Sequence, residues 1–202
     1  MTRSIVFLSI LTLLSFKIKE GTLTAQERSF ATKFLKDTQQ GVFDAVKDLS
    51  EAQLKFKATP EKWSIEEGVK HIAVSEKNLW ELVAGSLKQP ANGEKRSEIK
   101  ITDEQLVKGL QDRTNKVKTF DALEPRNTTY KSVDEALASF KENREKLITF
   151  VSTSKEDLRN HVSVLPLGTY DAYQLILLIS AHSNRHTQQI EEVKKEADFP
   201  KS

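Results

Sequence analysis

Two histidines four residues apart are the side chains of this sequence best suited to bind a metal ion. His182 and His186 belong to a run of residues spaced by three or four positions: Leu175, Ile179, His182, His186, Ile190 and Val193. This spacing places the run on one face of a helix, the face that a helical bundle buries. Its two imidazoles lie one turn apart, as two ligands of a single ion must. Residues 183–185 lack the glutamate of the H-E-x-x-H motif, so a zinc protease of that class is not indicated.

Spacing alone leaves two interpretations of this pair open. The rings could be buried and hydrogen-bonded to neighbours, or they could bind a metal that satisfies one nitrogen of each ring. A third histidine, His71, shares a predicted helical face with Gly68, Ser75 and Asn78, whose small or polar side chains leave room for a cavity. Taken alone, His71 is a residue at the edge of the core. Facing the pair from another helix, it would complete a three-histidine site.

Two polar residues could support such a site. Glu76 falls on an apolar helical stripe between Ile72 and Leu79, where an unpaired carboxylate would be unfavourable. It could accept a hydrogen bond from a ligand histidine or act as a base, and it could equally form an ion pair with a Lys or Arg of another helix. Gln189, three residues after His186 on the same face, could hydrogen-bond a ligand or close the end of the bundle.

Four further residues are assigned structural roles. Arg185, beside the histidine face, is expected to form a salt bridge between helices. Trp63 and Trp80 are expected to anchor packing, although Trp63 could also line the mouth of a pocket. His161 precedes Pro166 and is expected at the surface.

Helices are the elements that must position these residues. Gly (7) and Pro (5) are scarce, which favours long helices over a turn-rich β fold. Apolar periodicity and the capping pairs Ser64/Glu67, Thr102/Gln105 and Ser132/Glu135 predict helices over 27–49, 64–87, 102–120 and 132–151. A last helix extends to about residue 195 and is capped by Thr169 or Asp171. Since the helix over 102–120 is short and peripheral, the prediction is an all-α, antiparallel four-helix bundle with one short additional helix.

The first 25 residues are typical of a secretory signal peptide. Residues 1–3 are positively charged, residues 5–16 form an apolar run, and Leu23-Thr24-Ala25 resembles a cleavage site. The sequence thus predicts export, to the periplasm, of a mature single domain over 26–202. Lys17, Lys19 and Glu20 make the segment before this cut unusually charged, and an uncleaved anchor is the alternative.

Charge and cysteine content exclude several functions. Without residues 1–25 the chain has 28 basic and 28 acidic residues, so no basic surface indicates nucleic-acid binding. The absence of cysteine excludes disulfides, thiolate nucleophiles and thiolate metal sites. No second apolar run is long enough to cross a bilayer, so we expect no stable membrane span after cleavage.

Several motifs, in this order, resemble the DinB-like superfamily of metal-binding four-helix bundles. They are Leu54-Lys55-Phe56-Lys57 through Pro60 to Trp63-Ser64-Ile65-Glu66-Glu67, His71-Ile72 followed by Glu76, Pro166-Leu167-Gly168, and the segment 181–190, AHSNRHTQQI. The resemblance covers about residues 27–199. It implies a divalent metal, zinc or nickel, bound by His71, His182 and His186, and it carries the possibility of a homodimer.

The resemblance implies two kinds of enzyme acting on a small-molecule substrate. Some relatives are regarded as metal-dependent hydrolases, and others are transferases or isomerases that use low-molecular-weight thiols. An exported protein meets little of a reducing thiol pool, which weakens the second reading. A non-catalytic periplasmic bundle that binds a small molecule or a partner is the alternative, because Glu76 is the only acid or base that the sequence places near the site.

Overall fold

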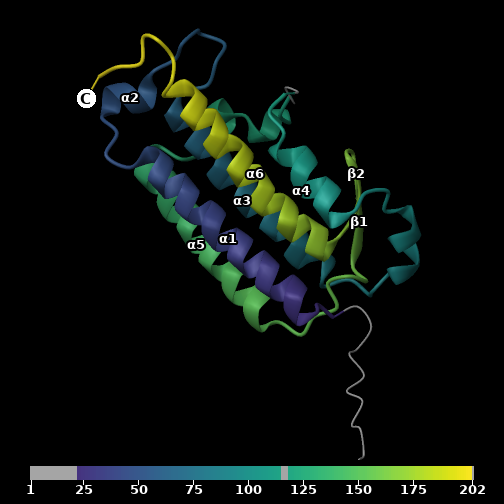
Figure 1. Ribbon diagram of the computed structural model, residues 1–202. Helices are drawn as coiled ribbons and strands as arrows, with labels where there is room; N and C mark the ends of the chain where they lie inside the picture. The colour runs from purple at the N-terminus through teal and green to yellow at the C-terminus, as the bar shows by residue number, and fades with distance from the viewer. Residues whose placement is uncertain (1–21, 115–117, 202) are drawn as a thin grey trace, which may run out of the picture.

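Four long helices form a bundle in the computed structural model, which describes residues 22–114 and 118–201 (Figure 1). They are α1 (Ala25–Val46), α3 (Ile65–Ser86), α5 (Val133–Thr153) and α6 (Ala172–Val193). The shorter elements are α2 (Glu51–Lys55), η1 (Gly93–Glu98), α4 (Asp103–Gln111), η2 (Asp121–Leu123), η3 (Pro125–Asn127), β1 (Val162–Leu165) and β2 (Gly168–Asp171). The predicted all-α four-helix bundle is confirmed.

Each long helix packs along two of the others. Helix α1 contacts α5 and α6, and α3 contacts the same two helices from the other side. The Tyr173 hydroxyl, at the start of α6, donates to the carbonyl of Glu27 at the start of α1, so these helices run the same way. Arg28, also at the start of α1, donates to the carbonyl of Val151 at the end of α5, so α1 and α5 are antiparallel.

Helix α3 runs against α6, since Gly68 near the start of α3 lies beside Ile190 near the end of α6. Two helices therefore run each way, with α1 and α6 parallel to each other and α3 and α5 parallel to each other. A parallel pair of neighbours needs a long connection. The segment between α3 and α5 provides it and contains η1, α4, η2 and η3.

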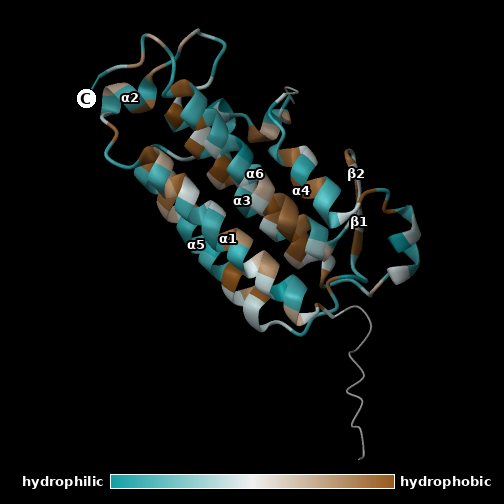
Figure 2. Ribbon diagram, viewed as in Figure 1, coloured by the Kyte–Doolittle hydropathy of each residue, from teal (hydrophilic) through white to brown (hydrophobic). Residues whose placement is uncertain are grey.

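Helix α6 lies at the centre of the packing. Its buried residues come from nearly every turn, and α4 covers the side of α6 that α1 and α3 leave open. Hydrophobic residues are concentrated in the first half of α6, whereas its second half, which carries His182 and His186, is largely hydrophilic (Figure 2). A helix buried on most of its surface is held firmly, which suits it to carry two site residues.

Local sequence signals explain where these helices begin. Of the three predicted capping boxes, those at Ser64/Glu67 and Thr102/Gln105 are formed. At Ser132/Glu135 the serine side chain caps α5, but the Glu135 carboxylate accepts from the backbone N–H of Lys131 instead of that of Ser132. Asp171, not Thr169, caps α6. Helix α4 was predicted to reach about residue 120 but ends at Gln111, because Asp112 has an extended backbone (ψ 116°) and continues no helix.

Several short elements were not predicted, among them a short helix and a β-hairpin. The connector after α1 contains the single turn of helix α2, capped by Ser50. Strands β1 and β2 form a hairpin in which Leu165 pairs with Gly168. Gly168 has φ +144°, and a Cβ there would lie 2.9 Å from the Tyr170 hydroxyl, so this turn requires glycine. A hairpin this short adds little to a fold that remains helical.

The described part of the chain begins just before the predicted cleavage site. Thr24 is the N-cap of α1, and Leu23 is buried against the bundle. Residues 1–21, which contain most of the predicted signal peptide, lie outside the described residues, and cleavage stays a prediction. Among the described residues no helix is long and apolar enough to cross a membrane.

Candidate metal centre

Helices α3 and α6 bring the three predicted histidines together. One ring nitrogen each of His71, His182 and His186 can be chosen so that all three lie within 4.8 Å of one another. The nearest pair is His71 Nε2 and His182 Nε2, 3.2 Å apart. Since α3 and α6 are antiparallel, the first half of α3 faces the second half of α6. Residues more than a hundred positions apart thereby form one cluster.

Contacts outside the cluster fix the orientation of two rings. His71 Nδ1 lies 2.8 Å from the carbonyl oxygen of Leu123 in η2. A carbonyl only accepts, so the proton of a neutral His71 is on Nδ1 and the lone pair of Nε2 points to the other histidines. His186 Nδ1 lies 3.0 Å from Gln189 Oε1, which orients this ring in the same way. Of the two roles considered for Gln189, the structure contains the hydrogen bond to a histidine of the cluster.

The three rings are held in their neutral form. Burial lowers the pKa of His71, and the hydrogen bond to Leu123 opposes this only in part. Loss of hydration lowers the pKa of His182 to about 3, and the proximity of His71 and of the Arg185 and Arg144 guanidinium groups adds to this shift. Burial and the two neighbouring histidines lower the pKa of His186 well below its usual value. Neutral imidazoles are the form that binds metals.

This donor set fits a divalent transition-metal ion. His71 Nε2 and His182 Nε2 face each other at 3.2 Å. Either one of these nitrogens donates a proton to the other, or both bind the same cation. An ion among the three nitrogens would satisfy all of the lone pairs at once. The oxygens that orient His71 and His186 match the second layer of contacts around metal-binding histidines.

Trp63 borders the cluster at the entrance to α3. Its ring centroid is 4.9 Å from that of His71 and 6.0 Å from that of His186, with which it is stacked at 18°. His182 and Trp63 are both partly exposed, whereas His71 is buried (2% exposed). The centre is therefore accessible beside His182, and Trp63 lines this mouth in addition to packing.

Glu76 is paired with an arginine that the sequence analysis did not single out. Arg144 Nε and Nη2 donate to the two carboxylate oxygens of Glu76 at 2.6 and 2.7 Å, and both side chains are buried. The remaining N–H groups of Arg144 bind Leu35 O, Thr38 Oγ1 and Ser183 Oγ. Of the two readings of Glu76, the structure contains the ion pair.

The other structural assignments have mixed outcomes. Trp80 packs on Phe150, with ring centroids 5.2 Å apart, as expected for an anchor. Arg185 donates hydrogen bonds to the backbone carbonyls of Leu110 and Asp112, which tie α6 to the end of α4. The prediction that His161 lies at the surface is wrong. It is 8% exposed, and its Nδ1 lies 3.0 Å from Ser86 O, because the hairpin folds back over the end of α3.

Sequence reasoning missed two contributors to the site region. Arg144 was detectable, since it interrupts the buried stripe of α5 between Phe140 and Leu147 at helical spacing. Leu123 was not detectable, because its backbone carbonyl contacts His71 and any residue type has that group.

Comparison with known proteins gives three consistent matches. The family model of the DinB superfamily matches residues 35–190, a range that includes all three histidines. The uncharacterised protein YuaE of Bacillus subtilis is 26% identical over 159 residues, covering 77% of this chain and 92% of YuaE. The structure of YfiT from Bacillus subtilis is described as that of a probable metal-dependent hydrolase with an unusual four-helix bundle topology.

The YfiT structure superimposes with a TM-score of 0.60 over 89% of this chain and 92% of YfiT, at 15% identity. At this identity the likeness concerns the fold. The family model covers most of the sequence, with the histidine cluster inside the matched range. The chain belongs to the DinB superfamily.

Proposed function

We propose that this chain is an exported metal-dependent hydrolase that acts on a small molecule. The observation that carries the proposal is the convergence of three neutral imidazole nitrogens within 4.8 Å beside a partly exposed mouth. His71, His182 and His186 would hold one divalent ion, zinc or nickel. When bound, the ion would supply a Lewis acid with open coordination positions, because three protein ligands leave room for water or a substrate oxygen.

The residues around the cluster would orient the ligands and shape access. Leu123 and Gln189 fix the rings of His71 and His186. Trp63 offers an apolar ring face beside them on which a substrate group can pack. A hydrolase with these features agrees with the description of YfiT, which shares the fold.

A non-catalytic binding protein is the second candidate, and one observation favours it. Glu76 is the only acid or base that the sequence placed near the site, and both of its oxygens are bound by Arg144. Proton transfer would therefore depend on the histidines, the solvent or the substrate. Such a bundle would bind a small molecule through the ion and Trp63 without turning it over.

The first test is metal content. Protein purified without chelators is analysed by mass spectrometry beside the His182→Ala/His186→Ala double variant and a His161→Ala control. The control removes a buried histidine outside the cluster, which contacts the carbonyl of Ser86 at the end of α3. We expect about one transition-metal ion per chain in wild type and control and none in the double variant. Wild-type protein that stays metal-free after incubation with zinc and with nickel would refute the metal site.

The second test separates the two candidates. Chromogenic carboxylic and phosphate esters and a chromogenic lactam are offered to the loaded protein. Hydrolysis that a chelator abolishes and zinc or nickel restores supports the hydrolase. A loaded protein that turns over none of them, yet binds the same compounds in calorimetry, supports the binding protein.

A further inference from the structure

The first turn of α1 is capped by Thr24, which precedes the predicted cleavage site after Ala25. Thr24 Oγ1 accepts a hydrogen bond from the backbone N–H of Glu27 at 3.1 Å. In return, Glu27 Oε2 accepts from the backbone N–H of Thr24 at 2.7 Å and from its hydroxyl at 2.8 Å. This reciprocal arrangement is a capping box, and it satisfies donors that the helix itself cannot. Thr24 is thus part of the folded domain.

Leu23 is also part of the folded domain. It is 6% exposed and belongs to the larger cluster of buried residues, which includes Ala31 and Leu35 of α1 and Tyr173 of α6. Burying a leucine side chain is among the strong contributions that a single residue makes to a fold. Removal of Leu23 would leave this part of the core open to water.

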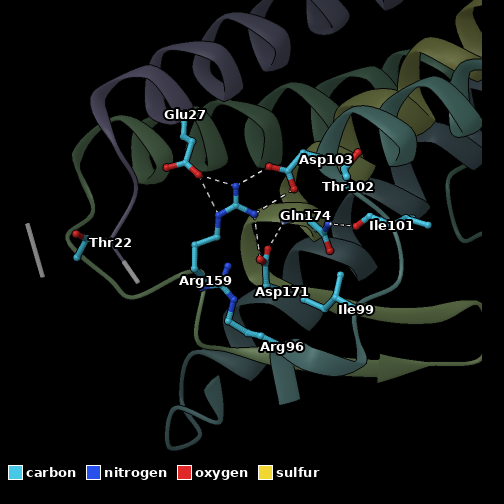
Figure 3. Close-up of a pocket in the computed structure, with 10 residues that line it drawn as sticks. All are labelled: Thr22, Glu27, Arg96, Ile99, Ile101, Thr102, Asp103, Arg159, Asp171 and Gln174. Carbon is cyan, nitrogen blue, oxygen red and sulfur yellow. Dashed lines mark hydrogen bonds and ion pairs between the residues drawn. The ribbon is translucent and has the colours of Figure 1, made fainter. Parts of the chain in front are cut away.

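Glu27 connects the cap to two other helices. Its Oε1 accepts from Arg159 Nε and Nη2, and the same guanidinium binds Asp103 at the start of α4 and Asp171, the N-cap of α6 (Figure 3). Thr22 lines the pocket beside this network (Figure 3). Thr24 therefore holds the Glu27 carboxylate, which is joined through Arg159 to the starts of α4 and α6.

A cut after Ala25 would damage this arrangement in three ways. It would remove the cap, remove Leu23 from the core, and place a new α-ammonium on Gln26 in the first turn of α1. A positive charge at the start of a helix opposes the helix dipole. The folded domain thus argues against the cleavage position that the small residues before Gln26 suggest.

We propose that the leader is cut between Ser15 and Leu23, so that Leu23 and Thr24 remain in the mature protein; this inference rests on the proposed export. The sequence supports an earlier cut independently. Lys17, Lys19 and Glu20 are unusual inside a leader, and a cut directly after the apolar run would place them in the mature chain. Ser15 can supply the small residue before such a cut. Gly21 can supply it for a later cut, which leaves the three charged residues in the leader but still keeps Leu23 and Thr24 in the mature chain.

The direct test is the N-terminus of the exported protein. The full chain is expressed in a Gram-negative host, and the periplasmic fraction is analysed by intact mass and N-terminal sequencing. We expect a first residue between positions 16 and 23. A first residue of Gln26 overturns the inference. An exported chain that keeps residues 1–25 overturns the cut but leaves export standing, and a chain found only in the cytosol overturns both.

A second test does not depend on export. Chains beginning at Thr22 and at Gln26 are compared by thermal unfolding without metal. We expect the Gln26 chain to melt roughly 5–15 °C lower, since it lacks both the cap and a buried leucine. In the longer chain, Thr24→Ala should reproduce part of this loss and Thr24→Ser should not. Equal melting temperatures of the two chains would overturn the structural argument.

Discussion

At the scale of single residues, the site depends on where three histidines keep their protons. His71 and His186 each direct Nδ1 to an oxygen outside the cluster, so that Nε2 is left for the centre. His182, in contrast, has His71 as its ring-nitrogen neighbour. Burial of the cluster keeps all three rings neutral. The metal-free protein therefore contains three bases that acid can protonate only at a cost in stability.

This predicts that the metal-free protein loses stability as the pH falls below about 6.5. The pKa values of His71, His182 and His186 are lower in the folded protein than in the unfolded chain, so the unfolded chain binds more protons in this range. The histidine contribution is fully present above pH 6.5. Below pH 6.5, the free energy of unfolding falls by about 1.4 kcal/mol per pH unit for each histidine that is protonated in the unfolded chain but neutral in the folded protein.

Urea unfolding of chelator-treated protein between pH 7 and 5 measures this dependence. The His182→Ala/His186→Ala variant should show a shallower dependence, because two of the three groups are gone. Identical slopes for wild type and variant would show that other groups cause the loss.

Two buried serines of α6 provide a matched pair of substitutions. Ser183 Oγ accepts from Arg144 Nη2 at 2.7 Å, whereas Ser180 Oγ has no hydrogen-bond partner within residues 22–114 and 118–201. We expect Ser183→Ala to cost about 1–3 kcal/mol, since it leaves a buried guanidinium N–H without an acceptor. Ser180→Ala should change stability by less than about 0.5 kcal/mol or raise it slightly. Denaturant unfolding measures both, and equal losses would contradict the assignment of these contacts.

At the scale of elements, Arg144 of α5 joins all four long helices. Its five N–H groups bind Glu76 of α3, Leu35 and Thr38 of α1, and Ser183 of α6. Because Ser183 is next to His182 in the sequence, the same guanidinium restrains the helices that carry the three clustered histidines. A buried charge of this kind is tolerated only when every donor has a partner.

Arg144→Met is therefore expected to destabilise the protein by about 3–5 kcal/mol, because it leaves the Glu76 carboxylate buried without a partner. The Arg144→Met/Glu76→Met double variant should recover part of this loss, since no charge remains buried. Lys146→Ala removes an exposed pair with Glu142 on the same helix and should cost less than about 0.5 kcal/mol. A double variant less stable than Arg144→Met would contradict this account.

Structural elements could be predicted from the sequence where the signal lies in neighbouring residues, but contacts between distant residues could not. Helix positions follow from apolar spacing and from caps such as Ser64 with Glu67, which involve residues three or four apart. The histidine pair was visible for the same reason. The position of Arg144 on the buried stripe of α5 is a local signal, but its pairing with Glu76 is a contact between distant parts of the chain. The burial of His161 against residue 86 is likewise a distant contact, and no local pattern specifies either one.

At the scale of the whole molecule, the histidine cluster links two antiparallel neighbours, α3 and α6, which the chain connects through the long segment between α3 and α5, through α5 itself and through the β1–β2 hairpin. The arrangement of the four helices could not be predicted from the sequence, because the spacing of apolar residues along a helix does not show which neighbouring helices run in parallel. An ion shared by these helices would hold together parts of the chain that are distant in sequence. Binding should then stabilise the fold as a whole.

We expect zinc or nickel at a hundred times its dissociation constant to raise the unfolding free energy by about 2.7 kcal/mol. For a domain of this size the melting temperature should rise by roughly 5–10 °C. Calorimetry with and without the ion measures the shift, and the His182→Ala/His186→Ala variant should show none. An equal shift in the variant would place the ion elsewhere.

The contact between His71 and the carbonyl of Leu123 has a consequence for how the protein can vary. A backbone acceptor is unaffected by the side chain attached to it, so most substitutions at position 123 should leave the orientation of His71 unchanged. The position of that carbonyl depends instead on the path of the short turns η2 and η3. Related sequences should therefore tolerate many residue types in this segment, whereas an insertion or a deletion there would disturb the orientation of His71, more than fifty positions away.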